Sequence, residues 1–239
     1  MSFELIYDYL ASPVFFRGAM MTLLVTVTSL VFGMLAGLVI ALLQESRFSA
    51  LRVLPVAYLW LFRGTPVLFQ IIFIYNVLPG FGIRLSAFLS AVIALSLNEG
   101  AYMAEIIRSG LSAVKKGQRT AGLALGLTRG GVMRYIVLPQ ALRVILPPIG
   151  NQMIGMLKTS ALVSVVAVQE LLLAANQTAA ANFRYFEALT AAGIYYLLLT
   201  TLFMVVQAWL ERVLDPKRRR QARARRPLIE RLIPSAGAR

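Results

Sequence analysis

Long stretches without a charged residue constrain this sequence more than any other feature. Residues 19–43, 64–83 and 188–210 contain no Asp, Glu, Lys or Arg. The hydrocarbon core of a lipid bilayer is about 30 Å thick, and roughly 20 helical residues are needed to cross it. Only 14% of the 239 residues are charged and 59% are hydrophobic, whereas about a quarter of the residues in soluble domains are charged. The sequence therefore predicts an integral membrane protein.

We predict an all-α fold with about five membrane-spanning helices in one transmembrane domain, residues 19–212. Ionisable side chains occur inside some of these spans, notably Glu99 and Glu105 in the third and Lys158 in the fourth. Ionisable groups at membrane depth usually face the interior of a helix bundle or a water-filled path. The predicted spans are residues 19–43, 55–79, 85–110, 144–172 and 187–211.

Basic residues are distributed unevenly among the segments that connect these spans. Two lie between the first and second spans, seven lie from Arg108 to Arg143, and ten lie from Arg212 onward; together they make 19 of the 24 Lys and Arg residues. Three lie in the intervening segments. Because positively charged loops stay in the cytoplasm, we expect a multi-pass membrane protein with its N-terminus outside and its C-terminus in the cytoplasm. Residues 1–18 should be periplasmic, and residues 113–143 should form a cytoplasmic loop.

The final segment, residues 213–239, is a strongly basic tail that this orientation places in the cytoplasm. Clusters of Lys and Arg beside a membrane are attracted to anionic lipid head groups. Nucleic acid is the weaker interpretation, because the segment has no aromatic side chain on which a base could stack. We therefore expect the tail to contact membrane lipid, and we expect no nucleic acid partner.

The amino-acid composition excludes several kinds of catalytic and metal-binding side chains. The sequence contains no His and no Cys, which removes imidazole bases, thiol nucleophiles and thiolate metal sites from consideration. It also contains no G-x-x-x-x-G-K-[ST] phosphate-binding loop. We expect no catalytic residue, no metal site and no cofactor bound by this chain.

The loop at residues 113–143 has the pattern of two short helices joined by a corner. Residues 118–125 are rich in Ala and Leu, which favour a helix. Gly126 suits the end of that helix, and Thr128 suits the N-cap of the next. An apolar stripe at helical spacing follows, and Pro139 should close the second helix. From the residues alone, an amphipathic hairpin lying on the membrane is the other interpretation.

Four blocks of sequence, in a fixed order, carry a family resemblance. They are FRGTPVLFQ at residues 62–70, LNEGAYMAEIIRSGL at 97–111, the loop sequence from Gly117 to Gln152 and GNQMIGMLKTSALVSVVAVQELL at 150–172. In the loop, Thr120-Ala121-Gly122 stands where the family has a Glu-Ala-Ala element, and Ile136 to Pro139 matches an Ile-x-Leu-Pro ending. The blocks resemble permease subunits of binding-protein-dependent ABC importers, in their polar amino-acid branch. The resemblance covers about residues 15–215.

The resemblance implies the type I ABC importer permease fold, a place in the bacterial inner membrane and a set of partners. A second permease subunit, identical or paralogous, would complete the pore; two copies of an ABC ATPase would use ATP and Mg; and a periplasmic binding protein would deliver an amino acid. Thr120 and Gly122 replace the family's usual Glu and second Ala, so the contact with the ATPase is expected to differ here. The residues implied for the ATPase-coupling loop are Thr120, Ala121, Gly122, Gly126, Leu127 and Pro139.

Polar and charged residues within the spans are the candidates for substrate contact: Glu99, Lys158, Gln70, Asn98 and Ser160. Glu99 could bind the ammonium group of an amino acid, or it could form an internal ion pair or hydrogen bond that steadies the bundle. Lys158 could bind the substrate carboxylate or pair with Glu99. The neutral residues could line the path, and hydrogen bonds between helices explain them equally well.

Two features near Arg63 are interpreted as structural. Pro66 should break the helical hydrogen-bond ladder and kink the second span. Glu105 should pair with Arg63 or with Arg108. Neither interpretation requires contact with a substrate.

These observations predict a passive translocation subunit of an ATP-driven amino-acid importer. A related zwitterionic or cationic solute, such as a compatible solute, an opine or a polyamine, is the alternative substrate. A membrane scaffold with a basic tail is a weaker alternative. A secondary transporter is not favoured, because such proteins usually have internal repeats and ten or more spans.

The distribution of positive charge generates a test of orientation. A reporter that is active only in the cytoplasm should work when it is fused after Asp215, and a periplasm-only reporter should work near Arg184. Reporter activity is measured in intact cells and normalised to the amount of each fusion. The opposite pattern at both positions would overturn the predicted orientation.

Overall fold

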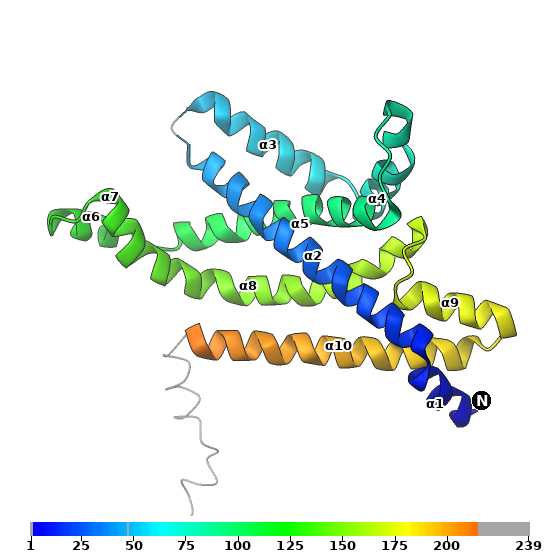
Figure 1. Ribbon diagram of the computed structural model, residues 1–239. Helices are drawn as coiled ribbons and strands as arrows, with labels where there is room; N and C mark the ends of the chain where they lie inside the picture. The colour runs from blue at the N-terminus through cyan, green and yellow to red at the C-terminus, as the bar shows by residue number, and fades with distance from the viewer. Residues whose placement is uncertain (1, 47, 215–239) are drawn as a thin grey trace, which may run out of the picture.

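The computed structural model describes residues 2–46 and 48–214, and within these ranges the chain is helical with short connections and no strand (Figure 1). The predicted all-α fold is confirmed. Four helical stretches in the described residues are long and apolar enough to cross a membrane, or five when one bent pair is counted as a span. The four are built on α2 (Pro13–Gln44), α5 (Ala87–Ser112), α8 (Leu138–Thr159) and α10 (Tyr185–Leu214).

The first long helix begins earlier than its predicted span. A short helix, α1 (Phe3–Ala11), ends at Ser12, whose hydroxyl accepts a hydrogen bond from the Val14 amide. Pro13 then occupies the first turn of α2, where its missing N–H group costs nothing. The residues before position 19 are therefore mostly helical.

Small residues bring α2 and α5 into close contact. A Cβ atom added at Gly33 of α2 would lie 2.8 Å from the Cβ of Glu99 on α5. One turn further along α2, a Cβ atom at Gly37 would collide with Met103 and would lie 3.0 Å from the carbonyl oxygen of Gly100. Small side chains let the backbones of membrane helices approach each other, and close packing replaces the hydrophobic effect that lipid cannot supply.

The second predicted span, residues 55–79, is two helices at a sharp angle. The chain bends by 100° between α3 (Ser49–Gly64) and α4 (Val67–Asn76). Thr65 and Pro66 are extended at the break, which confirms the predicted effect of Pro66. A single turn of 3-10 helix, η1 (Leu78–Phe81), follows α4.

The predicted hairpin is present at one end of the molecule, opposite the end at which α1 and α9 lie (Figure 1). Its first helix is α6 (Lys116–Ala124), and its second begins with α7 (Arg129–Val132). Gly126 has a φ of +84°, a left-handed conformation that ends α6. The hydroxyl of Thr128 accepts a hydrogen bond from the amide of Gly131 at 3.1 Å. The predicted Gly corner and Thr cap are confirmed.

The prediction that Pro139 closes the second helix is wrong. One wide turn, the π-helix η2 (Met133–Val137), follows α7, and α8 continues directly from it. The Leu138 amide bonds back to the carbonyl of Met133, five residues earlier. Because Pro139 lies in the first turn of α8 beyond this wide turn, the helix tolerates its ring and its missing N–H group.

The fourth predicted span, residues 144–172, is not one continuous α-helix. After α8 the chain tightens into the 3-10 helix η3 (Ser160–Val166), and Ala167 has a left-handed φ of 60°. A separate helix, α9 (Leu171–Asn182), starts where the span was expected to finish. Phe183, with a φ of 59°, turns the chain into α10.

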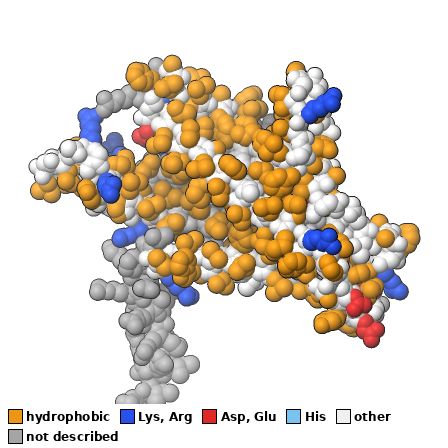
Figure 2. Space-filling model, in the orientation of Figure 1, with side chains coloured by type: hydrophobic (Ala, Val, Ile, Leu, Met, Phe, Trp, Pro, Cys, Tyr) orange, Lys and Arg blue, Asp and Glu red, His pale blue; other side chains and the backbone are white. Residues whose placement is uncertain are grey.

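Hydrophobic side chains cover most of the visible face of the molecule, and most Lys and Arg side chains lie toward its edges (Figure 2). Many apolar residues of α2, α3 and α10 are exposed, including Leu35 at 54%, Trp60 at 77% and Leu197 at 69%. An exposed apolar exterior is what a bundle surrounded by lipid requires.

The close contact of α2 with α5 generates a test of the fold. Replacing Gly37 with Leu would force the two helices apart, and overpacking of this kind costs about 1–3 kcal/mol or more. We expect a lower midpoint of thermal unfolding in detergent and less protein in the membrane. Gly193→Leu in α10 is the matched control, because a Cβ atom there meets nothing within 4 Å. Equal stability of the two variants would contradict the packing described here.

Candidate functional site

Glu99 is buried where α5 meets α2 and α8. Its side chain is 5% exposed, and its carbon atoms lie against Gly33 of α2. The Gln152 amide of α8 donates hydrogen bonds to both carboxylate oxygens, at 3.2 and 3.4 Å. Within the described ranges no basic side chain pairs with Glu99. The hydrogen bond from Gln152 favours the second of the two roles that the sequence left open for Glu99, an internal bond that steadies the bundle.

Lys158 and Ser160 lie close together in sequence but in different surroundings. Lys158, near the end of α8, is exposed, and among residues 2–46 and 48–214 it forms no salt bridge. The alternative in which it pairs with Glu99 is therefore absent from the described structure. Ser160 is fully buried, and its hydroxyl donates to the carbonyl of Leu157 at 2.8 Å. Of these two candidates, Lys158 is the one whose charged group is exposed, with no ion pair in the described part of the chain.

Gln70 and Asn98 are brought together at the break between α3 and α4. The Gln70 amide donates to the carbonyls of Phe62 and Thr65 at 3.0 and 3.1 Å. Asn98 of α5 donates to the same Phe62 carbonyl at 2.9 Å and to the side-chain oxygen of Gln70 at 3.2 Å. The helix break at Pro66 leaves these backbone carbonyls without their usual N–H donors. The side-chain amides of Gln70 and Asn98 take the place of those donors. The geometry favours hydrogen bonding between helices for both residues.

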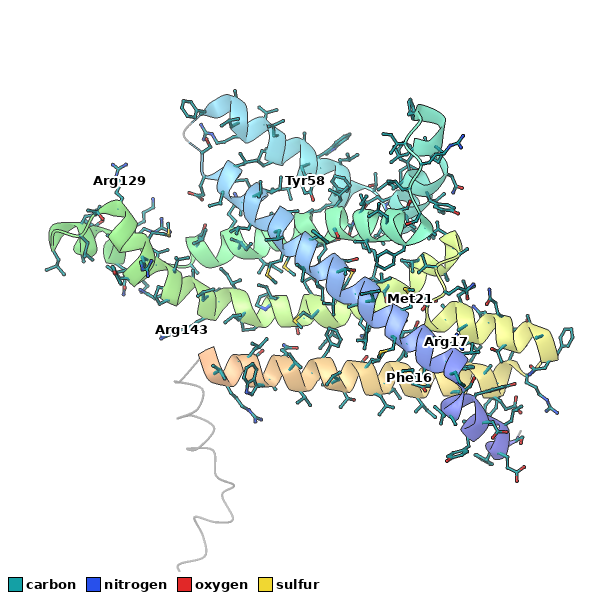
Figure 3. All side chains as sticks on the ribbon, in the orientation of Figure 1. Phe16, Arg17, Met21, Tyr58, Arg129 and Arg143 are labelled. Carbon is teal, nitrogen blue, oxygen red and sulfur yellow. The ribbon has the colours of Figure 1, made fainter. Side chains whose placement is uncertain are left out.

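An ion pair joins the end of α3 to α5. Arg63 pairs with Glu105, and its guanidinium carbon lies 5.6 Å from the centre of the Tyr102 ring. The two charged side chains are 42% and 38% exposed. Arg63 and Arg108 were the two partners predicted for Glu105, and the structure shows the pair with Arg63. Nearby, the hydroxyl of Tyr58 on α3 donates to the carbonyl of Leu97 on α5 at 2.5 Å, and Figure 3 shows Tyr58 lying between the two helices.

Glu170 is a buried carboxylate that the sequence reasoning did not single out. It is fully buried at the start of α9 and accepts hydrogen bonds from the amides of Leu172 and Leu173 at 2.8 and 2.7 Å. The hydroxyls of Tyr196 and Thr22 donate to the same carboxylate at 2.9 and 3.4 Å. Glu170 thereby ties the start of α9 to α10 and α2.

A local signal for this role was present in the sequence. A carboxylate directly before an apolar helical run is stabilised by the helix dipole and can accept from the first free amides of the helix. Assigning residues 144–172 to one continuous span hid the signal, since a new helix was not expected to begin at Leu171.

The hairpin holds the predicted coupling residues in a defined shape. Gly122 is buried in α6, where a Cβ atom would lie 2.5 Å from the Cδ1 of Ile136 and 3.0 Å from the Cγ2 of Val132. A glycine at this position therefore lets α6 lie close to α7 and η2. The Leu127 amide bonds back to the carbonyl of Gly122 at 3.1 Å, which closes the corner. Ala121 is exposed on the same helix.

A shallow groove runs between α6 and the turns that lead into α8. At its rim the Gln140 amide donates to the side-chain oxygen of Gln118 at 2.8 Å. The groove contains no charged side chain and is lined by Gly117, Gln118, Ala121, Gly122, Leu125, Tyr135, Ile136 and Gln140. Thr120 and Pro139 lie beside it without lining it, and both are exposed.

The predicted candidates therefore separate into distinct places. Gln70 and Asn98 meet at the helix break, Glu99 lies in the bundle interior, and Lys158 is exposed further along α8. Asn98 and Glu99 are adjacent in α5, yet within residues 2–46 and 48–214 their side chains bond to different partners, Gln70 and Gln152. Within the same ranges no three Asp, Glu, His or Cys side chains gather in a way that could hold a metal ion.

Comparison with known proteins gives a consistent result. A family model described as the inner membrane component of binding-protein-dependent transport systems matches residues 29–216. The chain is similar to the arginine transport system permease protein ArtQ of Bacillus subtilis, with 37% identity over 203 residues that cover 84% of this chain and 93% of the relative. It is also similar to the glutamine transport system permease protein GlnP of Escherichia coli, with 38% identity over 204 residues and the same two coverages, 84% and 93%.

Solved structures with the same arrangement include a crystal structure of an amino acid ABC transporter with histidines. That chain is 39% identical, superposes with a TM-score of 0.81, and the match covers 89% of this chain and 99% of the other. The inward-facing MetNI methionine ABC transporter matches with a TM-score of 0.73 at 19% identity, over 90% of this chain and all of the other. At that identity the likeness shows a shared fold.

Proposed function

Because the chain belongs to the family of inner membrane components of binding-protein-dependent transport systems, we propose that it is the membrane-spanning subunit of an ATP-driven amino-acid importer. Relatives named for arginine and glutamine transport support an amino acid as the substrate. The observation that carries the proposal is the ordered hairpin at residues 116–137, which projects at one end of the bundle and continues directly into α8.

The hairpin is the element through which ATP hydrolysis would drive the bundle. The sequence has no phosphate-binding loop of its own, so ATP and Mg would be used by two copies of a partner ATPase subunit. A small buried cluster fixes the base of the hairpin, and it consists of Val114, Val132, Val137, Ala141 and Ile145. Since α7 runs through η2 into α8 without a break, movement of the hairpin would be passed to the spans.

The other partners follow from the same assignment. A second permease subunit would complete the translocation path, and a periplasmic binding protein would deliver the amino acid. The hairpin end would face the cytoplasm, because the loops on that side carry most of the basic residues. The opposite end, with α1 and α9, would then face the periplasm.

Lys158 is the residue we assign to the substrate carboxylate. A charged group is costly to take out of water unless it meets a partner, and Lys158 is exposed without an ion pair in the described part of the chain. It lies about 22 Å along the helix from Arg143, a distance shorter than the roughly 30 Å of a bilayer core. A cation at this depth suits a carboxylate and opposes a polyamine, so it favours the amino acid over the cationic alternative.

The corner at Gly126 generates a test of coupling. Gly126→Val places a β-branched residue at a φ of +84°, which strains the corner. We expect normal insertion with loss of ATPase binding or of substrate-stimulated ATP hydrolysis. Gly130→Val in α7 is the matched control, because that glycine has no left-handed φ and a Cβ atom there meets nothing within 4 Å. Wild-type uptake by the Gly126→Val variant would show that the corner does not couple the subunits.

The assignment of Lys158 generates a second test. A charge-assisted hydrogen bond contributes about 1.5–3 kcal/mol, so Lys158→Gln should weaken the apparent affinity for the amino acid roughly ten- to hundredfold. Basal ATP hydrolysis and the amount of protein in the membrane should stay the same. Glu99→Gln should leave the affinity unchanged and reduce only the amount of folded protein, since Glu99 bonds within the bundle. A loss of affinity in Glu99→Gln, with Lys158→Gln unaffected, would reverse the two assignments.

A further inference from the structure

One face of α5 is polar over the half of the helix that leads to the hairpin. From Asn98 onward, polar residues recur at alternating spacings of four and three, which places them on one side of a helix. None of these residues is buried. We name them the α5 stripe, and they are Asn98, Tyr102, Glu105, Ser109 and Ser112.

The α5 stripe differs from the exposed faces of the other long helices. Exposed side chains of α2, α3 and α10 are mostly apolar, as at Leu35, Trp60 and Leu197, and this suits contact with lipid. On the stripe, Tyr102 is 39% exposed and the side chain of Glu105 is 38% exposed. An ionisable group at membrane depth is costly against lipid and usually faces a bundle interior or a water-filled cavity. The stripe is therefore a face that is turned away from lipid.

The stripe is open toward the hairpin end and closed at the other. Ala91 and Leu95 occupy the same face of α5 further from the hairpin, and both are fully buried. At Asn98 the side-chain amide donates to the side-chain oxygen of Gln70 at 3.2 Å, so the stripe begins at the break between α3 and α4. From Asn98 to Ser112 it runs about 21 Å along the helix. A wall of this shape suits a passage that opens at the hairpin end.

The Arg63–Glu105 pair places one charge of each sign on this wall. The guanidinium carbon of Arg63 also lies 5.6 Å from the centre of the Tyr102 ring. Within the described ranges neither charged residue forms a second salt bridge. A zwitterionic amino acid carries the same two charges, so its carboxylate can take the place of Glu105 beside Arg63 while its ammonium group pairs with Glu105. Such an exchange leaves no charge unpaired at membrane depth.

We infer that the α5 stripe lines the half of the translocation path nearer the hairpin, and that Arg63 and Glu105 bind the carboxylate and the ammonium group of an amino acid that passes along it. The inference rests on the proposed function, which supplies the amino acid. It adds to Lys158 a second point of contact, built from α3 and α5. A second permease subunit packed on the stripe is the other occupant, but contacts between membrane helices are typically made by small residues rather than by an ion pair.

Cysteine accessibility tests whether water reaches the stripe. The chain contains no Cys, so Tyr102→Cys provides a single thiol. The full-length permease, with the subunits that co-purify with it, is placed in lipid nanodiscs and treated with a methanethiosulfonate that carries a quaternary ammonium group. The thiolate attacks the reagent sulfur, a mixed disulfide forms and methanesulfinate leaves.

Mass spectrometry of the intact chain follows the rate of this modification. Tyr102→Cys should be modified rapidly, and saturating L-glutamine or L-arginine should slow the reaction severalfold. Leu198→Cys is the matched control, because Leu198 is 61% exposed near the middle of α10, on a face that suits lipid. That thiol should react slowly with or without the amino acid, since a thiol in lipid does not ionise.

Neutralising the ion pair tests its contact with substrate. Arg63→Met combined with Glu105→Leu keeps an apolar contact between α3 and α5, and replacing an ion pair by apolar residues is often neutral for stability. We expect the same amount of protein in the membrane but a roughly tenfold weaker apparent affinity in amino-acid uptake, because a charge-assisted hydrogen bond is lost. Arg63→Lys combined with Glu105→Asp is the control, since it keeps one charge of each sign and should stay close to the wild-type affinity.

The outcomes separate this inference from the proposed function. If Tyr102→Cys reacts as slowly as Leu198→Cys in a complex that takes up amino acids, the inference is overturned and the proposed function stands. Reaction only after detergent dissociates the complex also overturns it, because a partner subunit then covers the stripe. Wild-type affinity in the neutralised pair would leave Arg63 and Glu105 a structural role alone. Rapid modification of Tyr102→Cys in a complex that takes up no amino acid would support a water-filled passage and contradict the proposed function.

Discussion

Water cannot reach the backbone N–H and C=O groups of a chain in the hydrocarbon core of a membrane, so the protein must satisfy them itself. Helices do so along most of this chain, and side chains do so where a helix breaks. At the 100° bend after α3, Gln70 and Asn98 supply the donors that Pro66 and the extended backbone take away. At the start of α9, the carboxylate of Glu170 accepts the first free amides. The polar residues in these apolar segments therefore allow the helix to break within the bilayer, because they bond to the backbone groups that the break exposes.

Features that depend on neighbours in the sequence could be predicted from the sequence. The corner at Gly126, the cap at Thr128 and the break at Pro66 each follow from the conformational limits of one residue type, and all three are present. The same local reasoning failed at Pro139. A proline usually ends a helix because its ring meets the preceding turn, but the π turn before it widens that turn. Sequence rules for proline assume regular α-helical spacing, and here the spacing changes one turn earlier.

Features that depend on distant residues could not be predicted in the same way. Gln152 is separated from Glu99 by 53 positions, and Thr22 is separated from Glu170 by 148. Which carboxylate meets a neutral amide, a hydroxyl or a cation is decided by how the helices pack, and hydropathy carries no information about that. The sequence therefore indicated that acidic and basic groups lie within the bundle, but it could not distinguish an internal hydrogen bond at Glu99 from contact with a substrate. The residue type at position 158 indicated a charged group in the fourth span, whereas the absence of an ion pair for it within residues 2–46 and 48–214 emerged only from the fold.

The uninterrupted helix from the hairpin into the membrane has a mechanical consequence. From Arg129 to Thr159 the elements α7, η2 and α8 follow one another directly, and Ile145 presses against Gly110 of α5, where no added Cβ atom would fit. If the helix tilts, this tight contact is the point about which it would pivot. At 1.5 Å per residue, the arm from Ile145 to the hairpin is about 24 Å and the arm to Lys158 is about 20 Å. With arms so nearly equal, a tilt of this helix as one rigid body about that contact would move Lys158 nearly as far as the hairpin and in the opposite direction.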